Sequence, residues 1–195
     1  VADSYTGLTM ALAITLACYD KKRTGKGRRI DVAMLDTMFA TIEDAVLAYA
    51  LTGKEISRTG NAKPREIVPY DTYYCADDFI AVGINDESMW PDFCDALEMP
   101  ELKDDPLYAT NDLRCSNFEG FTKLMQGVFK EKTAAWLLER FWQFNIPASV
   151  IVDPVDDMTN PQMLARDMII DIDDPNVGRF TAFGIPGKFS KTPGY

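Results

Sequence analysis

The sequence contains no histidine among its 195 residues. Any catalytic triad or metal site that depends on histidine is therefore excluded within this chain. Its four cysteines lie far apart and show no C-x-x-C spacing, so we expect neither a disulfide framework nor a metal site. The longest apolar run spans about 12 residues, whereas a bilayer needs about 20, and no signal peptide is visible. We therefore predict a cytoplasmic protein with no membrane partner.

Positive charge is also scarce. The chain carries 20 Lys and Arg against 30 Asp and Glu, which gives a net charge of −10. This balance argues against nucleic acid or an anionic membrane as the main partner. Apolar residues make up 47% of the chain, so it is not intrinsically disordered, and its length suffices for one sizeable core or two small ones.

The N-terminal region carries helix signals at both ends. Asp3 precedes an apolar run at residues 8–19, and a short carboxylate there can cap the first helical turn. The run ends in KKRTGKG, whose basic side chains suit the negative end of the helix dipole and whose glycines can provide a left-handed stop. Because the run is apolar on nearly every side, we expect this helix to be buried all round.

Three segments of this region occur together at a specific spacing: ADSYTG at residues 2–7, RTGKG at 23–27 and IDVAM at 30–34. This combination resembles the class III CoA-transferase family, which includes the formyl-CoA transferases and the CaiB and BaiF types. Weaker motifs follow in family order over nearly the whole chain: RTGN at 58–61, PY at 69–70, DESMW at 86–90, IPA at 146–148, NPQ at 160–162 and TPG at 192–194.

In that family the aspartate of the first segment is the catalytic nucleophile, so the resemblance assigns this role to Asp3. The substrate would be a coenzyme A thioester, and a carboxylate suits the transfer because the acyl anhydride it forms is about as activated as the thioester. Gly7 lies one helical turn from Asp3 and would let the substrate approach closely, so it is a predicted substrate-binding residue. From the residues alone, Asp3 is also interpretable as a plain helix N-cap.

The second predicted substrate-binding segment comprises Gly60, Asn61, Ala62 and Lys63. In formyl-CoA transferases a glycine-rich loop follows a similar G-N-A segment and covers the catalytic aspartate. Here KPRE at residues 63–66 replaces the run of glycines, while Lys63 could meet a carboxylate or a phosphate. The alternative interpretation is a solvated linker.

The resemblance implies an incomplete α/β fold. Residues 1–53 would form the C-terminal segment of a Rossmann-like large domain, residues 54–160 a small α/β domain, and residues 161–195 a returning linker. The match covers only the second half of a typical family member, so we expect most CoA contacts to lie outside this chain. Family members are interlocked homodimers, and apolar surface on residues 1–53 would need a partner.

Hydrophobic periodicity predicts the remaining elements. Residues 28–34 alternate as a strand, residues 34–50 repeat every four positions as a helix, and residues 70–75 and 79–84 indicate a hairpin. Further expectations are helices opened by Asp86 and Thr133, a helix over residues 113–129, a buried strand over 147–152, a short helix over 160–166, and strands over 168–172 and 179–183.

Two other functions stay open beside CoA transfer to a carboxylic acid. The related α-methylacyl-CoA racemases share this fold, and in them an acid near the position of Asp86 helps to move the α-proton. A helix cap is the alternative role for Asp86. The chain could instead be a catalytically incomplete fragment that acts only as an interaction or dimerisation domain. The basic residues between positions 21 and 29 are either a CoA phosphate site or an ordinary helix terminus.

Overall fold

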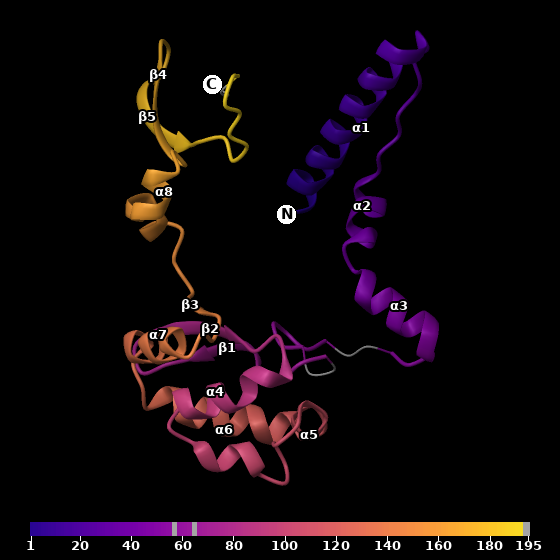
Figure 1. Cartoon of the computed structure of the whole chain (residues 1–195). Helices are drawn as coiled ribbons and strands as arrows, with labels where there is room; N and C mark the ends of the chain where they lie inside the picture. The colour runs from indigo at the N-terminus through magenta and orange to yellow at the C-terminus, as the bar shows by residue number, and fades with distance from the viewer. Residues whose placement is uncertain (56–57, 64–65, 193–195) are drawn as a thin grey trace. The chain divides into compact units, whose positions relative to one another are not determined.

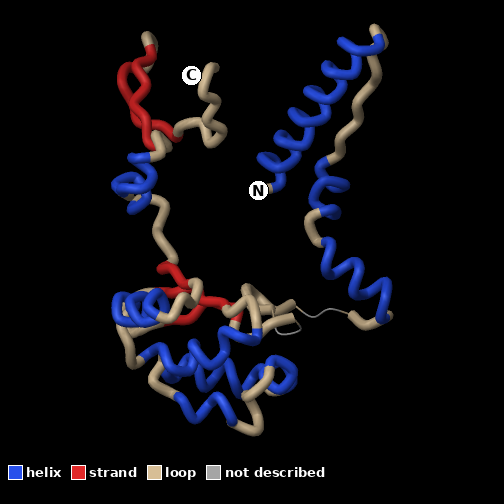
Figure 2. Tube along the Cα trace, in the orientation of Figure 1, coloured by secondary structure: helices blue, strands red, loops and turns tan. Residues whose placement is uncertain are grey.

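The computed structural model describes residues 1–55, 58–63 and 66–192, without the side chains of residues 43 and 44. The chain is of the α/β class and divides into two compact units, Val1–Arg58 and Thr59–Tyr195, each of which is described by itself (Figures 1 and 2). The division into residues 1–53, 54–160 and 161–195 stays a prediction.

The first unit contains three helices: α1 (Ala2–Thr24), α2 (Met34–Ala40) and α3 (Glu43–Thr52). Helix α1 ends at Gly25, which has a left-handed φ of 71° and donates its N–H to the Lys21 carbonyl at 2.8 Å. Helix α3 ends in the same way at Gly53, with φ 65°. The predicted glycine stop is therefore confirmed at the first of the two candidate positions, because a left-handed residue ends a helix most cheaply when it has no Cβ.

Three expectations for this unit are wrong. Residues 28–33 form no strand, since a strand needs a neighbour for its backbone N–H and C=O groups and the described part of the unit holds none. The single helix expected over residues 34–50 is two helices, interrupted at Thr41 and Ile42. Helix α1 buries none of its residues within this chain: Leu8 and Leu12 are 66% and 60% exposed. An apolar surface on all sides predicted that α1 would be covered, but the described residues of the first unit do not bury it.

The second unit is built on a three-stranded antiparallel sheet of order β1-β2-β3. Strands β1 (Tyr70–Tyr74) and β2 (Phe79–Gly83) form the predicted hairpin, in which Tyr70 faces Gly83 and Thr72 faces Ala81. Strand β3 (Ala148–Val150) pairs with β2 at the other edge. It is shorter than expected and only partly buried, because an edge strand has a neighbour on one side alone.

Helices cover this sheet, and we call the sheet and its helices the small domain. Helix α6 contacts β1, α7 contacts β3, and α4 contacts α7. The expected caps are present: Asp86 accepts the Ser88 N–H at 2.8 Å and Thr133 accepts the Trp136 N–H at 3.3 Å. The helical elements are η1 (Glu87–Met89), α4 (Trp90–Ala96), η2 (Pro100–Asp104), α5 (Asn111–Ser116), α6 (Phe118–Lys130) and α7 (Ala134–Gln143).

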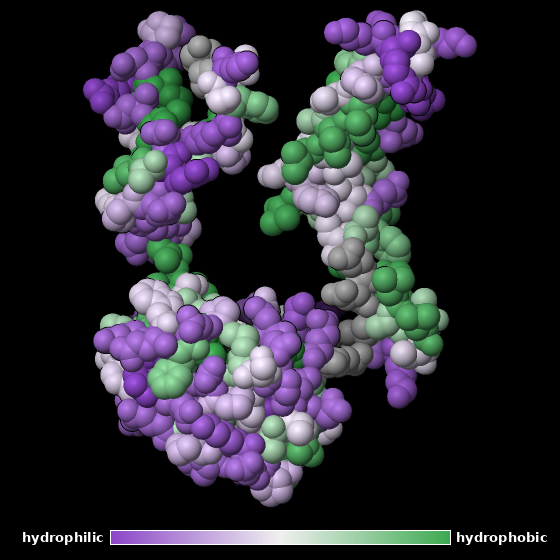
Figure 3. Space-filling model, in the orientation of Figure 1, coloured by the Kyte–Doolittle hydropathy of each residue, from purple (hydrophilic) through white to green (hydrophobic). Residues whose placement is uncertain are grey.

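An aromatic cluster forms the core of the small domain. The ring of Phe93 stacks on that of Phe141 with centroids 5.6 Å apart, and Phe129 lies 4.6 Å from Tyr73 and 6.0 Å from Phe141. All four side chains are at most 2% exposed. Figure 3 shows the contrast in surface chemistry: hydrophilic residues dominate the small domain, whereas hydrophobic side chains lie exposed along the first unit.

The C-terminal segment contains a short helix and a separate hairpin. Asn160 caps α8 (Pro161–Ala165) by accepting the Gln162 N–H at 2.9 Å. The strands expected over residues 168–172 and 179–183 are present as β4 (Ile169–Asp174) and β5 (Gly178–Phe183), and the structure pairs them antiparallel. The remaining short element is η3 (Asp156–Thr159).

Candidate active site

Asp3 lies in the first turn of α1, exposed to solvent. The predicted N-cap role is wrong, because the helix begins two residues earlier than it would with Asp3 as its cap: Val1 holds the cap position, and no side chain caps the helix. Within the described part of the chain, the Asp3 carboxylate therefore makes no capping bond. It still lies where backbone N–H groups give the helix its positive end.

Gly7 follows Asp3 by one turn on the same helix and is exposed. A Cβ placed on Gly7 would meet no atom within 4 Å. The helix itself therefore has no need of glycine here, since its φ is helical and the space is open. The close approach of a substrate to this position stays a prediction.

The small domain carries a surface pocket of about 390 Å³ over its sheet. The register of the strands places Thr72, Ala81 and Ser149 side by side across β1, β2 and β3, and all three line the pocket. Asn61, which precedes the sheet by nine residues, lines it too. The other lining residues are Tyr70, Asp71, Val82, Gly83, Asn85, Pro147 and Ala148.

Asp71 is the acidic side chain in this lining. Partial burial raises its pKa above the usual value, because burial removes water from the carboxylate. The Thr72 N–H, which donates to Asp71 Oδ1 at 2.7 Å, works in the opposite direction. A carboxyl in a pocket with a raised pKa is a typical functional candidate. Asp71 was not among the predicted site residues, because nothing in YDTYY distinguishes a carboxylate in a pocket lining from a solvated one.

Of the four predicted loop residues, Asn61 is the one that reaches the pocket lining. Its Nδ2 donates to Thr72 Oγ1 at 3.3 Å, which joins the loop to β1. Ala62 is buried at 6% exposure, and its carbonyl accepts from the Thr59 hydroxyl at 2.9 Å. Gly60 has a left-handed φ of 67° and is exposed. The solvated-linker interpretation is thus wrong for Ala62, which is buried, whereas Asn61 is exposed and is joined to β1 by one hydrogen bond.

Lys63 lies at the edge of this pocket. Its Nζ pairs with Glu66 Oε2 at 3.2 Å and lies 5.5 Å from the centre of the Tyr70 ring. The Tyr70 ring in turn rests against Gly83: a Cβ on that glycine would lie 2.6 Å from Tyr70 Cδ2. Gly83 therefore makes room for an aromatic wall of the pocket, which the sequence pattern did not indicate.

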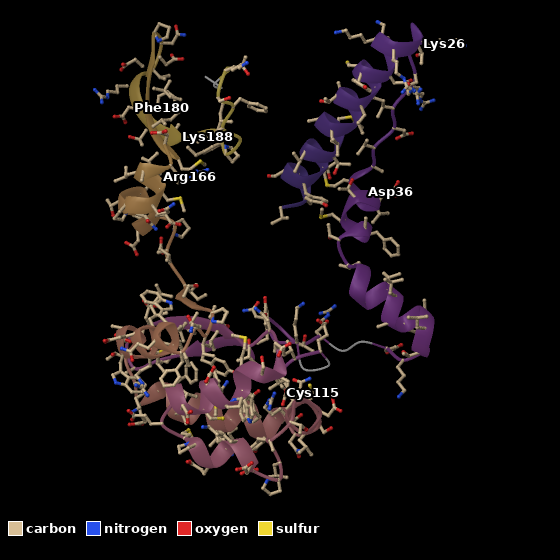
Figure 4. The ribbon with its side chains drawn as sticks, viewed as in Figure 1. Lys26, Asp36, Cys115, Arg166, Phe180 and Lys188 are labelled. Carbon is tan, nitrogen blue, oxygen red and sulfur yellow. The ribbon has the colours of Figure 1, made fainter. Side chains whose placement is uncertain are left out.

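The basic cluster does not adjoin Asp3 along α1. Lys21, Lys22 and Arg23 stand in the last turn of this 23-residue helix, about 30 Å from Asp3 at the usual rise per residue. Lys26 follows beyond the C-cap, as Figure 4 shows. Arg28 pairs with Asp20. These contacts favour the ordinary helix-terminus interpretation.

Asp86 acts as a helix cap. Its carboxylate accepts the Ser88 N–H at 2.8 Å, and hydrogen bonds from Ser88 lower its pKa. A carboxylate of lowered pKa is a poorer proton carrier near neutral pH.

Comparison with known proteins defines the class. The family model for CoA-transferase family III matches residues 1–195, so the chain belongs to that family. Acetyl-CoA:oxalate CoA-transferase from Acetobacter aceti is 29% identical over 170 residues, which cover 87% of this chain and 43% of that protein. Human succinyl-CoA:glutarate CoA-transferase is 30% identical over 191 residues, which cover 98% of this chain and 43% of that protein. The chain thus spans about half the length of the curated relatives it matches.

Solved structures agree with this assignment. A CaiB/BaiF family protein from Brucella suis aligns with a TM-score of 0.77 and 31% identity over 98% of this chain and 49% of its own. A protein from Mycobacterium tuberculosis aligns with a TM-score of 0.83 at 16% identity, which supports the fold alone. In the described ranges no group of three potential metal ligands comes together, and no helix there is long and apolar enough to cross a membrane.

Proposed function

We propose that this chain is the C-terminal portion of a CoA-transferase that moves CoA between an acyl-CoA and a carboxylic acid. One observation carries the proposal: a member of this family presents an exposed aspartate, free of capping bonds, in the first turn of α1. A nucleophile needs an oxygen that is not engaged elsewhere, and Asp3 meets this condition.

The proposed reaction begins when a carboxylate oxygen of Asp3 attacks the thioester carbonyl. The carbon–sulfur bond breaks, CoA leaves as the thiolate, and a mixed anhydride joins Asp3 to the acyl group. The acceptor carboxylate then attacks the Asp3 carbonyl of this anhydride and releases the donor acid. Finally the CoA thiolate attacks the acceptor's acyl carbon, which forms the new thioester and restores the Asp3 carboxylate. Each step exchanges one leaving group for one nucleophile and needs no oxidant or metal.

The predicted substrate-binding residues would hold the acyl and acid groups during these steps. Asn61 offers an amide at the pocket over the sheet, and Lys63 offers a cation beside it, which suits a carboxylate. Gly7 and Gly60 would allow close approach of substrate. Ala62, which lies between Asn61 and Lys63 in sequence, anchors the loop. The relatives named above act on oxalate and glutarate, so a carboxylic acid acceptor is the substrate class we propose.

A hydroxylamine trap tests the anhydride. We expect the protein at the full length of its relatives, incubated with acyl-CoA and hydroxylamine, to form a hydroxamate on Asp3 that peptide mass spectrometry detects. Asp3→Ala should abolish transfer. Asp36→Ala is the matched control, since Asp36 is also an exposed aspartate in the first turn of a helix. Full transfer by Asp3→Ala would exclude the proposal.

One observation favours a second function for the chain by itself. The exposed apolar residues of α1 indicate a surface that another polypeptide covers, so we expect residues 1–195 alone to be inactive and to associate, as a fragment or dimerisation domain would. We propose a homodimer for the complete protein. Light scattering coupled to size exclusion measures the association, and detectable CoA transfer by the 195-residue chain would contradict the fragment hypothesis.

The racemase alternative is weaker in this structure. It needs an acid that exchanges the α-proton, and Asp86 is instead occupied as a cap with a lowered pKa. Exchange of the α-proton in deuterium oxide without CoA transfer would nevertheless support it.

A further inference from the structure

The residues that lead from the predicted loop into β1 have an unusual set of partners. We call residues 66–69 the stem, because they join Lys63 and its loop to the first strand of the sheet. The backbone of Val68 pairs with side chains: its N–H donates to Asn111 Oδ1 at 3.0 Å, and its carbonyl accepts from Arg114 Nε at 2.6 Å. Both partners stand on α5, more than 40 residues away in sequence.

Asn111 holds the stem at a second point. Its Nδ2 donates to the Glu66 carbonyl at 2.9 Å, so one amide side chain pairs with two backbone groups of the stem. The stem is in turn joined to the loop, since the N–H groups of Glu66 and Ile67 both donate to the Lys63 carbonyl, at 3.0 and 3.1 Å. A displacement of Asn111 would therefore reach Lys63 through two hydrogen bonds.

Arg114 anchors the same network from within the core. Its side chain is fully buried, with the guanidinium 4.0 Å from the centre of the Trp90 ring. Its Nη2 donates to Glu87 Oε2 at 2.7 Å, and its Nη1 donates to the Tyr108 carbonyl at 3.0 Å. Burial lowers the Arg114 pKa, and the Glu87 carboxylate opposes this shift. A planar guanidinium with several fixed donors holds its neighbours in one geometry.

Glu87 is the third member of this network. Its Oε1 also accepts the Asn111 N–H at 3.1 Å, so it pairs with both α5 residues. Glu87 opens η1, two residues after Asn85, which lines the pocket over the sheet. The network thus connects the stem of the loop on one side of the pocket to the segment that begins at Asn85.

We infer that Asn111, Arg114 and Glu87 form a clamp that positions the loop of Asn61 and Lys63 for substrate binding. This inference rests on the proposed function, because it gives the loop a substrate to bind. The three clamp residues are positioning residues: they act through the stem backbone. Glu87, Asn111 and Arg114 are separated in sequence by 24 and 3 positions, so only the fold reveals their connection.

Hydrogen exchange on the intact chain tests the clamp without any need for activity. We expect Asn111→Ala to speed the exchange of the Val68 amide about tenfold or more, because that N–H loses its acceptor. Asn117→Ala is the matched control: its Nδ2 donates to the Leu107 and Leu113 carbonyls, and within the described part of the chain it makes no hydrogen bond to the stem. Arg114→Lys keeps the positive charge but removes the forked donors of the guanidinium, so it should also speed amide exchange in the stem. This second variant provides the test if Asn111→Ala fails to fold.

Kinetics of the full-length protein test the positioning role. Asn111→Ala should raise the KM for the carboxylic acid roughly three- to tenfold and leave kcat within about twofold, since it weakens binding rather than the chemical step. A merely structural residue would lower the active fraction and thus kcat. Unchanged exchange at Val68, or faster exchange with an unchanged KM, would overturn the inference. Failure of the Asp3 hydroxamate would overturn the proposed function instead, and would leave the exchange result standing.

Discussion

Both units of this chain contain apolar helices, but the helices of the small domain bury their apolar side chains and those of the first unit leave them exposed. In the small domain, helices α4, α6 and α7 bury Phe93, Phe129 and Phe141 in one aromatic cluster. In the first unit, Thr37 is the buried residue among the described side chains, and the leucines of α1 are exposed. An apolar helical sequence therefore predicts that the helix is covered, but it does not indicate which polypeptide covers it. Whether the covering layer belongs to the same chain depends on the rest of the protein.

Thiol labelling should give the largest contrast between the units. Cys18 is exposed on α1, whereas Cys75 and Cys94 are fully buried and burial raises their pKa values to about 11 and about 12. In the native 195-residue chain, diluted until it is monomeric, we expect iodoacetamide to modify Cys18 at least about a hundredfold faster than either buried thiol, since the thiolate is the nucleophile. Mass spectrometry of the peptides measures the rates. Protection of Cys18 would show that α1 is covered, and would remove the contrast.

Truncation of core and surface side chains should give the next largest difference. Phe129→Ala empties a site between Tyr73 and Phe141, and should lower the free energy of unfolding by about 3–5 kcal/mol. Leu12→Ala, at a position 60% exposed, should change it by no more than about 0.5 kcal/mol. Urea denaturation of the isolated chain compares the two. Equal losses would mean that Leu12 is buried in solution.

A smaller effect should follow Gly83→Ala. The added methyl group would meet the Tyr70 ring at 2.6 Å, so the ring must turn away from β2. We expect a loss of about 1–3 kcal/mol in unfolding free energy, typical of overpacking. Gly127→Ala on α6 is the matched control, because its Cβ would meet nothing within 4 Å and alanine favours a helix by about 0.5–1 kcal/mol. If Gly83→Ala proved as harmless as the control, Tyr70 would not form a fixed wall of the pocket.

The smallest effects concern two carboxylates whose pKa values shift in opposite directions. Burial raises the Asp71 pKa above 3.8, so the stability that its protonated form contributes is present below pH 3.8 and is lost as pH rises through the raised pKa. Hydrogen bonds from Arg179 and Thr181 lower the Asp171 pKa below 3.8, so its contribution is present above that pH and is lost as pH falls through the lowered pKa.

Amide variants separate these two cases. Relative to the unsubstituted chain, Asp71→Asn should become more stable as pH rises from 3 to 6. Asp171→Asn should be less stable at neutral pH, and the deficit should close at acidic pH. Thermal unfolding across this pH range provides the measurement. A pH-independent difference for Asp71→Asn would mean that the pocket does not desolvate this carboxylate.

Local signals were sufficient for much of the fold. The glycine at position 25 ended α1, Asp86 and Thr133 capped their helices, and the aromatic and β-branched residues of β1 and β2 formed a hairpin, because each of these features depends on neighbours within a few residues. The strand expected over residues 28–34 failed for the converse reason: a strand is completed by a partner that local sequence cannot provide. For the site, the resemblance singled out Asp3 and the loop that contains Asn61, but it could not indicate Asp71 or the Tyr70 wall.

By itself, then, the sequence determined the family, the capped helices, the hairpins and the absence of histidine chemistry. Only the tertiary structure decided which carboxylate lost its water, which backbone groups Asn111 and Arg114 hold, and which apolar helix stayed exposed. The physical reason is the distance along the sequence between the residues that interact. Caps and turns are settled by atoms a few residues apart, whereas desolvation, buried ion pairs and helix coverage depend on residues that the folded chain brings together from distant positions.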